Sequence, residues 1–179
     1  YSSAASDVYK RQAGNTEIWN GTNWTEVNDL NTARKSLAGA GTTTSTIVFG
    51  GYDGDRNEEA ESWNGTSWTE VAEINTGRSA LSAGGNSPIS AAVVFGGNTA
   101  PAVSALTELW NGSYWTELNE QNTARFGQAS VGQVSNAALT VGGSSASSGC
   151  LKQISWSSSS DIRKLFGAAS EQTEHSMHS

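Results

Sequence analysis

Three segments of nearly identical sequence recur along the 179-residue chain, and this repeat constrains the fold more than any other feature. They occupy Glu17–Val27, Glu61–Val71 and Glu108–Leu118, and each has the pattern Glu-x-Trp-Asn-Gly-(Thr/Ser)-x-Trp-Thr-Glu before a Val or Leu. Units of the same sequence are expected to form the same supersecondary structure. A single unit cannot bury its apolar face alone, so neighbouring units stack on one another. The chain is therefore expected to be a repeat protein.

Two further markers recur in the same order in every unit. The first is Asn-Thr-(Ala/Gly)-Arg, at 31–34, 75–78 and 122–125, and the second is an apolar run that ends in Gly-Gly, at 47–51, 93–97 and 139–143. Together the three markers define units of 44 to 47 residues. We expect the following repeated positions to be structural: Trp19, Trp24, Arg34, Gly50, Gly51, Trp63, Trp68, Arg78, Gly96, Gly97, Trp110, Trp115, Arg125, Gly142, Gly143 and Trp156.

The sequence pattern of each unit predicts four short strands. One strand of small residues, such as 36–42, follows the Arg marker, and a second, such as 46–49, ends at the double glycine, which permits a sharp turn. The third and fourth strands flank Asn-Gly, a strong hairpin signal. A four-residue loop would place the two tryptophans of a unit opposite each other. A two-residue loop would instead place Trp63 opposite Thr66 and Trp68 opposite Glu61.

Four strands in a unit of this length are typical of a β-propeller blade. The sequence thus predicts an all-β fold built from four-stranded antiparallel blades. Asn31–Arg34, Ile47–Gly54 and Ala60–Val71 resemble a kelch repeat, a family whose blades carry an early Arg, a double glycine, and a paired aromatic residue and Trp. The Trp-Asn-Gly-Thr-x-Trp pattern is also similar to propeller-like repeats in structural proteins of tailed phages and in bacterial surface proteins.

We expect residues 13–162 to form about 3 to 3.5 blades. They comprise a half blade 13–30, blades 31–74 and 75–121, and a degenerate blade 122–162 in which Gln153–Trp156 keeps the register of a third strand. A closed propeller needs about four blades, so an incomplete ring is predicted. The chain is then part of a longer reading frame, or copies associate to close the ring. Open blade edges also favour self-association.

The two ends do not follow the repeat. Residues 1–12 have no counterpart in later units and resemble the translated adapter sequence found in assembled environmental reads, so we predict a non-native or disordered leader. A natural N-terminal arm is the alternative. Residues 163–179 match nothing earlier and are predicted to be an unpatterned tail.

The residue inventory disfavours an enzyme. The two histidines, His175 and His178, lie in the tail, and the predicted blades contain no Ser/His/Asp set and no cluster with metal-ligand spacing. We therefore expect no catalytic site and no cofactor. The formal net charge of −7 disfavours nucleic acid as a partner. The sequence contains no run of 18 apolar residues, so it predicts no membrane span.

One loop has oxygen ligands at alternating positions, as in a calcium-binding loop. These are Asp53, Asp55 and Asn57. Glu58 stands where that pattern has a glycine, and Asn64 stands where it has a bidentate Glu. We therefore expect an exposed acidic loop and not a metal site.

The repeated side chains have a structural and a functional interpretation. The tryptophans could stack on sugar rings, but their recurrence in every unit favours packing between neighbouring blades. Arg34, Arg78 and Arg125 could form an anion-binding ring. The resemblance to kelch repeats implies instead that each donates to backbone carbonyls of an adjacent blade, which the planar guanidinium suits.

The connections after the double glycine vary, whereas the strands hardly change. They are 52–58, 98–105 and 144–149. Variable loops on a constant scaffold are where recognition normally occurs. We expect a non-catalytic binding or structural module that recognises a protein or glycan, as part of a phage or bacterial surface protein. The alternatives are a purely architectural segment, or part of a propeller enzyme whose site lies in other blades.

Overall fold

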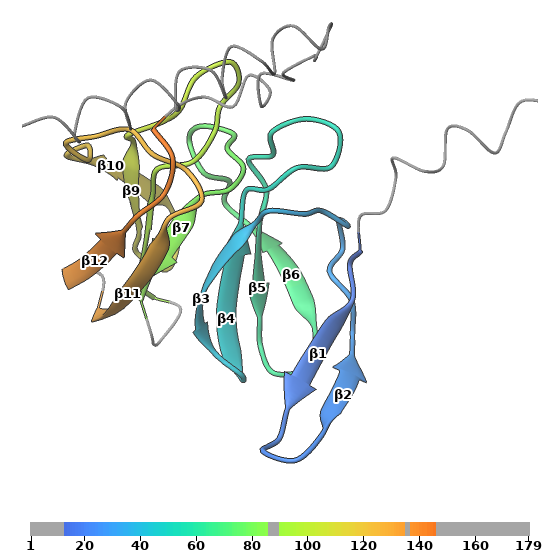
Figure 1. The fold of residues 1–179 in the computed structure, drawn as a ribbon. Coiled ribbons are helices and arrows are strands. Elements are labelled where there is room, and N and C mark those ends of the chain that lie inside the picture. The colour runs from blue at the N-terminus through green and yellow to red at the C-terminus, as the bar shows by residue number, and fades with distance from the viewer. Residues whose placement is uncertain (1–12, 86–89, 135–136, 146–179) are drawn as a thin grey trace, which may run out of the picture. The chain divides into compact units, whose positions relative to one another are not determined.

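The computed structural model describes residues 13–85, 90–134 and 137–145, and the secondary structure of these residues is entirely β, without a helix. The strands are β1 Thr16–Trp19, β2 Trp24–Val27, β3 Ala38–Thr42, β4 Ser45–Phe49, β5 Ala60–Trp63, β6 Trp68–Val71, β7 Ser82–Gly84, β8 Ala92–Phe95, β9 Thr107–Trp110, β10 Trp115–Leu118, β11 Ala129–Val134 and β12 Ala137–Val141 (Figure 1). The predicted leader, the tail and Trp156 lie outside the described residues.

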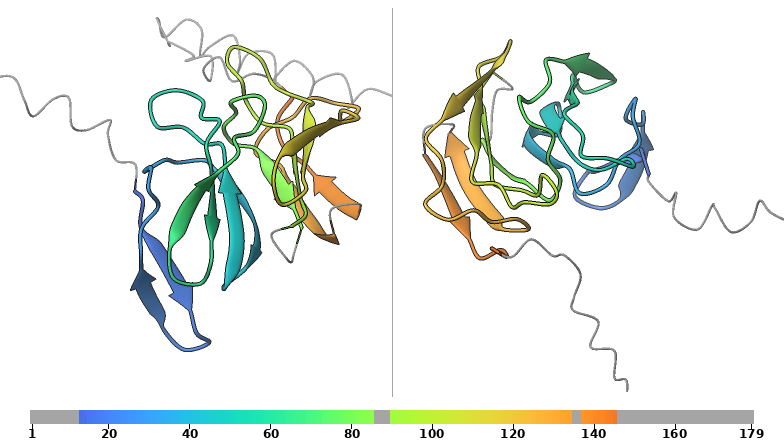
Figure 2. Two further views of the ribbon diagram at one scale, coloured as in Figure 1. Left: turned by 180° about the vertical axis from the view of Figure 1, so that it is seen from behind. Right: turned by 90° about the horizontal axis from the view of Figure 1, so that it is seen from above.

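The strands form two four-stranded antiparallel sheets, β3-β4-β5-β6 and β7-β8-β9-β10, and two two-stranded sheets, β1-β2 and β11-β12. Figures 1 and 2 show each four-stranded sheet as a meander of sequential strands. The predicted all-β propeller with four-stranded blades is confirmed. By repeat position, β1-β2 is the second half of a blade and β11-β12 is the first half. These two halves are not paired with each other, so the described strands do not close a ring.

The Asn-Gly hairpins have four-residue loops, which resolves the alternative left open by the sequence. Trp63 pairs with Trp68, and the equivalent tryptophans pair in the other two hairpins. Their rings are tilted by 44–45° with centroids 5.2–5.5 Å apart. Asn64 Oδ1 accepts the backbone N–H groups of Thr66 and Ser67, each at 2.9 Å, so the side chain satisfies the loop donors itself.

The first strand of each blade begins later than predicted. β3 starts at Ala38 rather than Ser36, because Ser36 has a φ of 57° and cannot continue an extended strand. Ala80 and Gly127 occupy the same repeat position and also have positive φ, 51° and 62°. These residues join successive blades, since Ala80 N–H donates to Ser36 O and Gly127 N–H donates to Ala80 O, both at 2.8 Å.

The double glycine turns the chain and also brings it close to the backbone of the next blade. Gly51 N–H donates to the carbonyl oxygen of Arg78 in the next blade at 2.8 Å, and a Cβ on Gly50 would lie only 2.7 Å from that oxygen. Gly97 N–H donates in the same way to Arg125 O. The glycines thus let the backbone of one blade approach that of the next without a side chain between them.

A pair of glycine substitutions separates this close approach from simple backbone strain. Gly50 and Gly127 have nearly equal φ, 63° and 62°, but a Cβ on Gly127 would meet nothing within 4 Å. Gly127→Ala is expected to cost about 1–2 kcal/mol for the left-handed conformation. Gly50→Ala should cost about 1–3 kcal/mol more because the added methyl group overlaps its neighbours. Urea unfolding of both variants measures the difference, and equal losses would contradict the inter-blade role.

Candidate functional site

The repeated arginines are buried against glutamates of their own blades. Arg34 Nη1 lies 2.6 Å from Glu61 Oε1, and Arg78 Nη2 lies 2.6 Å from Glu108 Oε1, with all four side chains nearly inaccessible. Burial lowers the pKa of the Arg78 guanidinium, and the Glu108 carboxylate opposes that shift. Because both guanidinium charges are paired, these two arginines do not offer free cations for an anion.

The prediction that these arginines bond an adjacent blade is wrong. Arg78 does donate to backbone carbonyls, those of Gly96 at 3.0 Å and Leu106 at 2.8 Å, but both belong to its own blade. Only a carboxylate can neutralise a guanidinium withdrawn from water, and the blade supplies one from its third strand. The Glu that stands two residues before the first Trp of all three Asn-Gly hairpins is the sequence signal for this partner.

The asparagine of the same marker binds the second oxygen of each glutamate. We call this set of one Asn, one Arg and one Glu the clamp. Asn31 donates its backbone N–H at 2.8 Å and its Nδ2–H at 2.9 Å to Glu61 Oε2. Asn75 makes the same two contacts with Glu108 Oε2, both at 2.8 Å. The first two Asn-Thr-x-Arg segments therefore each bind both oxygens of one buried carboxylate.

Removal of one clamp carboxylate should be strongly destabilising. Glu108→Ala leaves the Arg78 charge buried and unpaired, which is expected to cost about 3–5 kcal/mol in the free energy of unfolding. Glu120 is an exposed glutamate of the same blade, and Glu120→Ala should cost less than about 0.5 kcal/mol. Urea denaturation of the two variants provides the comparison. A loss for Glu108→Ala no larger than that of Glu120→Ala would show that the clamp contributes little.

Arg125 lacks such a clamp in the described part of the chain. Its Nη1 donates to Gly142 O at 3.3 Å, and its Nε is buried without a hydrogen-bond partner. The glutamate position of this unit is occupied in the sequence by Ile154, which lies outside the described residues. The third arginine therefore has no carboxylate from its own unit at the position used by the other two.

The second tryptophan packs against the preceding blade in two of the three hairpins, as predicted. Trp115 Nε1 donates to Ala72 O at 2.8 Å, and its ring meets Phe49 edge-on with centroids 5.0 Å apart. Trp68 Nε1 donates to Thr16 Oγ1 at 3.1 Å. Trp24, at the same position in the half blade, is 64% exposed, because no described blade precedes it.

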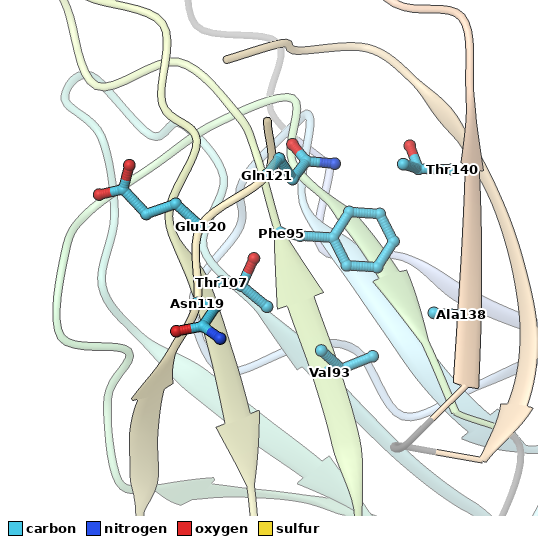
Figure 3. Close-up of a pocket in the computed structure, with 8 residues that line it drawn as sticks. All are labelled: Val93, Phe95, Thr107, Asn119, Glu120, Gln121, Ala138 and Thr140. Carbon is cyan, nitrogen blue, oxygen red and sulfur yellow. The ribbon is translucent and has the colours of Figure 1, made fainter. Parts of the chain in front are cut away.

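Two cavities lie beside the incomplete blades. One, of about 240 Å³, lies between the β8–β9 blade and β12, with Phe95, Asn119 and Thr140 in its lining. Figure 3 shows the Phe95 ring pointing toward the strand that carries Thr140. The other, of about 520 Å³, is more apolar and is lined by two of the three hairpin tryptophan pairs, Trp19 with Trp24 and Trp63 with Trp68. Both cavities are thus associated with half blades.

The variable loops share one anchor and differ at their tips. Asn57 N–H donates to Gly51 O at 3.0 Å, and Ser104 N–H donates to Gly97 O at 2.8 Å, so the same backbone bond closes both loops. Arg56 Nη2 donates to Asn98 Oδ1 at 3.2 Å and joins the two loops. The exposed tip of the first loop, 53–55, is acidic, whereas that of the second, 100–102, is Ala-Pro-Ala.

An aromatic residue and two cations lie at the base of the acidic tip. Lys35 Nζ lies 5.3 Å and Arg56 Cζ lies 5.5 Å from the centroid of the Tyr52 ring, which is within the range of cation–π contacts. Tyr52 remains partly accessible. The loop therefore combines a fixed aromatic ring with exposed carboxylates.

The oxygens of the metal candidate are bonded within their own loop. Asp53 accepts Asp55 N–H at 3.3 Å and Asn57 Nδ2–H at 3.0 Å, while Asp55 accepts Arg56 N–H at 2.8 Å. Asn57 Oδ1 accepts Glu59 N–H at 2.6 Å. No group of three or more His, Cys, Asp or Glu within the described ranges could hold a metal ion. Nor does any helix in those ranges have the length and apolar character to cross a membrane.

Comparison with known proteins does not assign the chain to a family. No protein-family model matches the chain, and no curated protein matches it. The resemblance to kelch repeats therefore stays a prediction that rests on the repeat motifs.

Proposed function

We propose that this chain is a non-catalytic recognition module of kelch-like type, which binds a protein or glycan with the loops that follow its double glycines. We place it on a phage particle or a bacterial cell surface, following the resemblance of its Trp-Asn-Gly-Thr-x-Trp hairpins. The observation that carries the proposal is the pair of loops with one backbone anchor and different tips, 52–58 and 98–105. A constant frame with variable tips allows specificity to change without loss of the fold.

The loops are held well enough to be pre-organised for binding. Gly51 and Gly97, which anchor them, are fixed by hydrogen bonds to the next blade, and the Arg56–Asn98 contact links one loop to the other. A surface that is ordered before its ligand arrives loses less conformational entropy on binding.

The first loop has the chemistry of a polar binding site. Asp53 and Asp55 are exposed carboxylates that would accept hydrogen bonds from sugar hydroxyls or from Lys and Arg side chains. Tyr52 adds an aromatic face, a group that contributes strongly to binding energy at interfaces. The negative net charge of the chain, −7, favours such partners over phosphate backbones.

Screening of the full chain against glycan arrays and arrays of bacterial surface proteins tests the proposal. For a captured ligand, Tyr52→Ala and the double variant Asp53→Ser/Asp55→Ser should each weaken binding at least about tenfold, as expected for loss of an interface hot spot. The matched control is Glu70→Ser/Glu73→Ser, which removes two exposed carboxylates outside the loops and should leave affinity unchanged.

Two outcomes would count against the proposal. Absence of any ligand on both arrays would favour the purely architectural role. Equal loss of affinity in the loop variants and in the Glu70/Glu73 control would show that net charge, and not the loop, determines binding.

A further inference from the structure

We propose that the side chains of Gln121 and Gln128 form an amide pair that determines which unit packs after the blade 75–121. The pair replaces an apolar contact that joins the two complete blades. A blade that ends in an amide at this position packs correctly only on a unit that also begins with one. The pair lies inside the blades and is independent of the recognition loops.

One residue pair spans each boundary between successive units. Its first member stands directly before the Asn-Thr-x-Arg marker, and its second member stands three residues after the arginine. In chain order the three pairs are Leu30 with Leu37, Ile74 with Leu81, and Gln121 with Gln128. The first two pairs are aliphatic, and in the third pair both members are glutamine. The two positions therefore change together.

At the boundary between the two complete blades, this pair is apolar and buried. Ile74 is 1% exposed and Leu81 is 6% exposed, and both belong to the hydrophobic core. They lie beside Gly50, because a Cβ on that glycine would overlap Leu81 Cδ2 and would lie 3.5 Å from Ile74 Cδ1. Ile74 N–H donates to Glu58 O of its own blade at 2.9 Å, whereas Leu81 belongs to the next unit. The contact thus joins side chains of two successive units.

At the following boundary, the same seat contains two amides. Gln121 Nε2 donates to Gln128 Oε1, and Gln128 Nε2 donates to Gln121 Oε1, both at 3.3 Å. Gln128 is only 7% exposed, and its Nε2 also donates to Phe95 O at 3.4 Å. A Cβ on Gly96 would overlap Gln128 Nε2 and would lie 3.1 Å from Gln121 Oε1. The amide pair therefore lies beside Gly96 as the apolar pair lies beside Gly50.

The two kinds of pair cannot be exchanged one member at a time. A mixed contact, Ile74 with Gln128 or Gln121 with Leu81, would bury an amide against an alkyl side chain. That amide would lose its hydrogen bonds to water without gaining a protein partner, which is unfavourable. A matched pair avoids this cost, in the way that a buried asparagine fixes the register of a coiled coil.

A chain of similar units needs such a difference between its boundaries. The hairpins Glu61–Val71 and Glu108–Leu118 share one pattern, and the buried Arg–Glu pairs of the two complete blades have the same 2.6 Å contact. These repeated contacts do not distinguish one blade from another. During folding, a blade can therefore dock on the wrong neighbour or on another copy. The amide pair disfavours such docking at one boundary, because a mispaired blade has an amide without a partner.

Urea unfolding of the full chain tests the pairing. Gln121→Ile and Gln128→Leu each remove one amide from the other, so each should raise the equilibrium constant for unfolding at least about fivefold. The double variant Gln121→Ile/Gln128→Leu reproduces the apolar pair and should unfold no more readily than the wild type. If a single variant does not fold, recovery of the folded state in the double variant, seen by circular dichroism, gives the same answer.

The reciprocal substitutions at the apolar boundary are the matched comparison. Leu81→Gln alone should be more destabilising than Leu81→Gln added to Ile74→Gln, because the second glutamine supplies a partner for the first. Effects that simply add, at either boundary, would overturn the amide pair.

Refolding tests whether the pair also selects the neighbour. Each protein is diluted out of urea, and size-exclusion chromatography measures the fraction that no longer elutes with the untreated protein. This misassembled fraction should be at least about twofold larger for Gln121→Ile/Gln128→Leu than for the wild type, since all three boundaries are then apolar. Glu70→Gln places an amide at an exposed position of the blade 31–74 and should change neither measurement. Equal misassembly of the double variant and the wild type would overturn the selection of the neighbour.

Discussion

Arg78, the arginine of the second Asn-Thr-x-Arg marker, joins the structure in two directions. The side chain of Arg78 is fixed inside its own blade by Glu108, and its carbonyl oxygen accepts the N–H of Gly51 in the preceding blade. Withdrawing a guanidinium from water is costly unless a carboxylate and further acceptors satisfy it. The buried ion pair therefore determines where the backbone of the marker lies, and the marker joins blade to blade.

The loops and the open edges follow from this arrangement. Because Gly51 and Gly97 are bound to the next blade, the segments that follow them begin from fixed points and differ only at their tips. Within the described residues, Trp24 is exposed and the Nε of Arg125 has no hydrogen-bond partner, so the contacts of the complete blades are not repeated at these two positions.

Much of the fold could be predicted from the period of the repeat, but the contacts of individual residues could not. The three markers correctly predicted four-stranded blades and the packing of Trp68 and Trp115 on the preceding blade. The direction of the arginine side chains was predicted wrongly, since spacing alone does not tell which strand a long side chain reaches. The left-handed conformation of Ser36 and Ala80 was also missed, because neither residue type has a preference for positive φ.

The sequence by itself determined the unit, its four strands and the positions that recur, because hairpin signals and glycines act locally and the period repeats them. Tertiary structure decided which groups of successive units meet. Those contacts depend on how closely two backbones approach, as at Gly50, and on which buried charge finds a partner, as between Arg34 and Glu61. Such distances arise only when whole blades pack together, and residue order along the chain does not specify them.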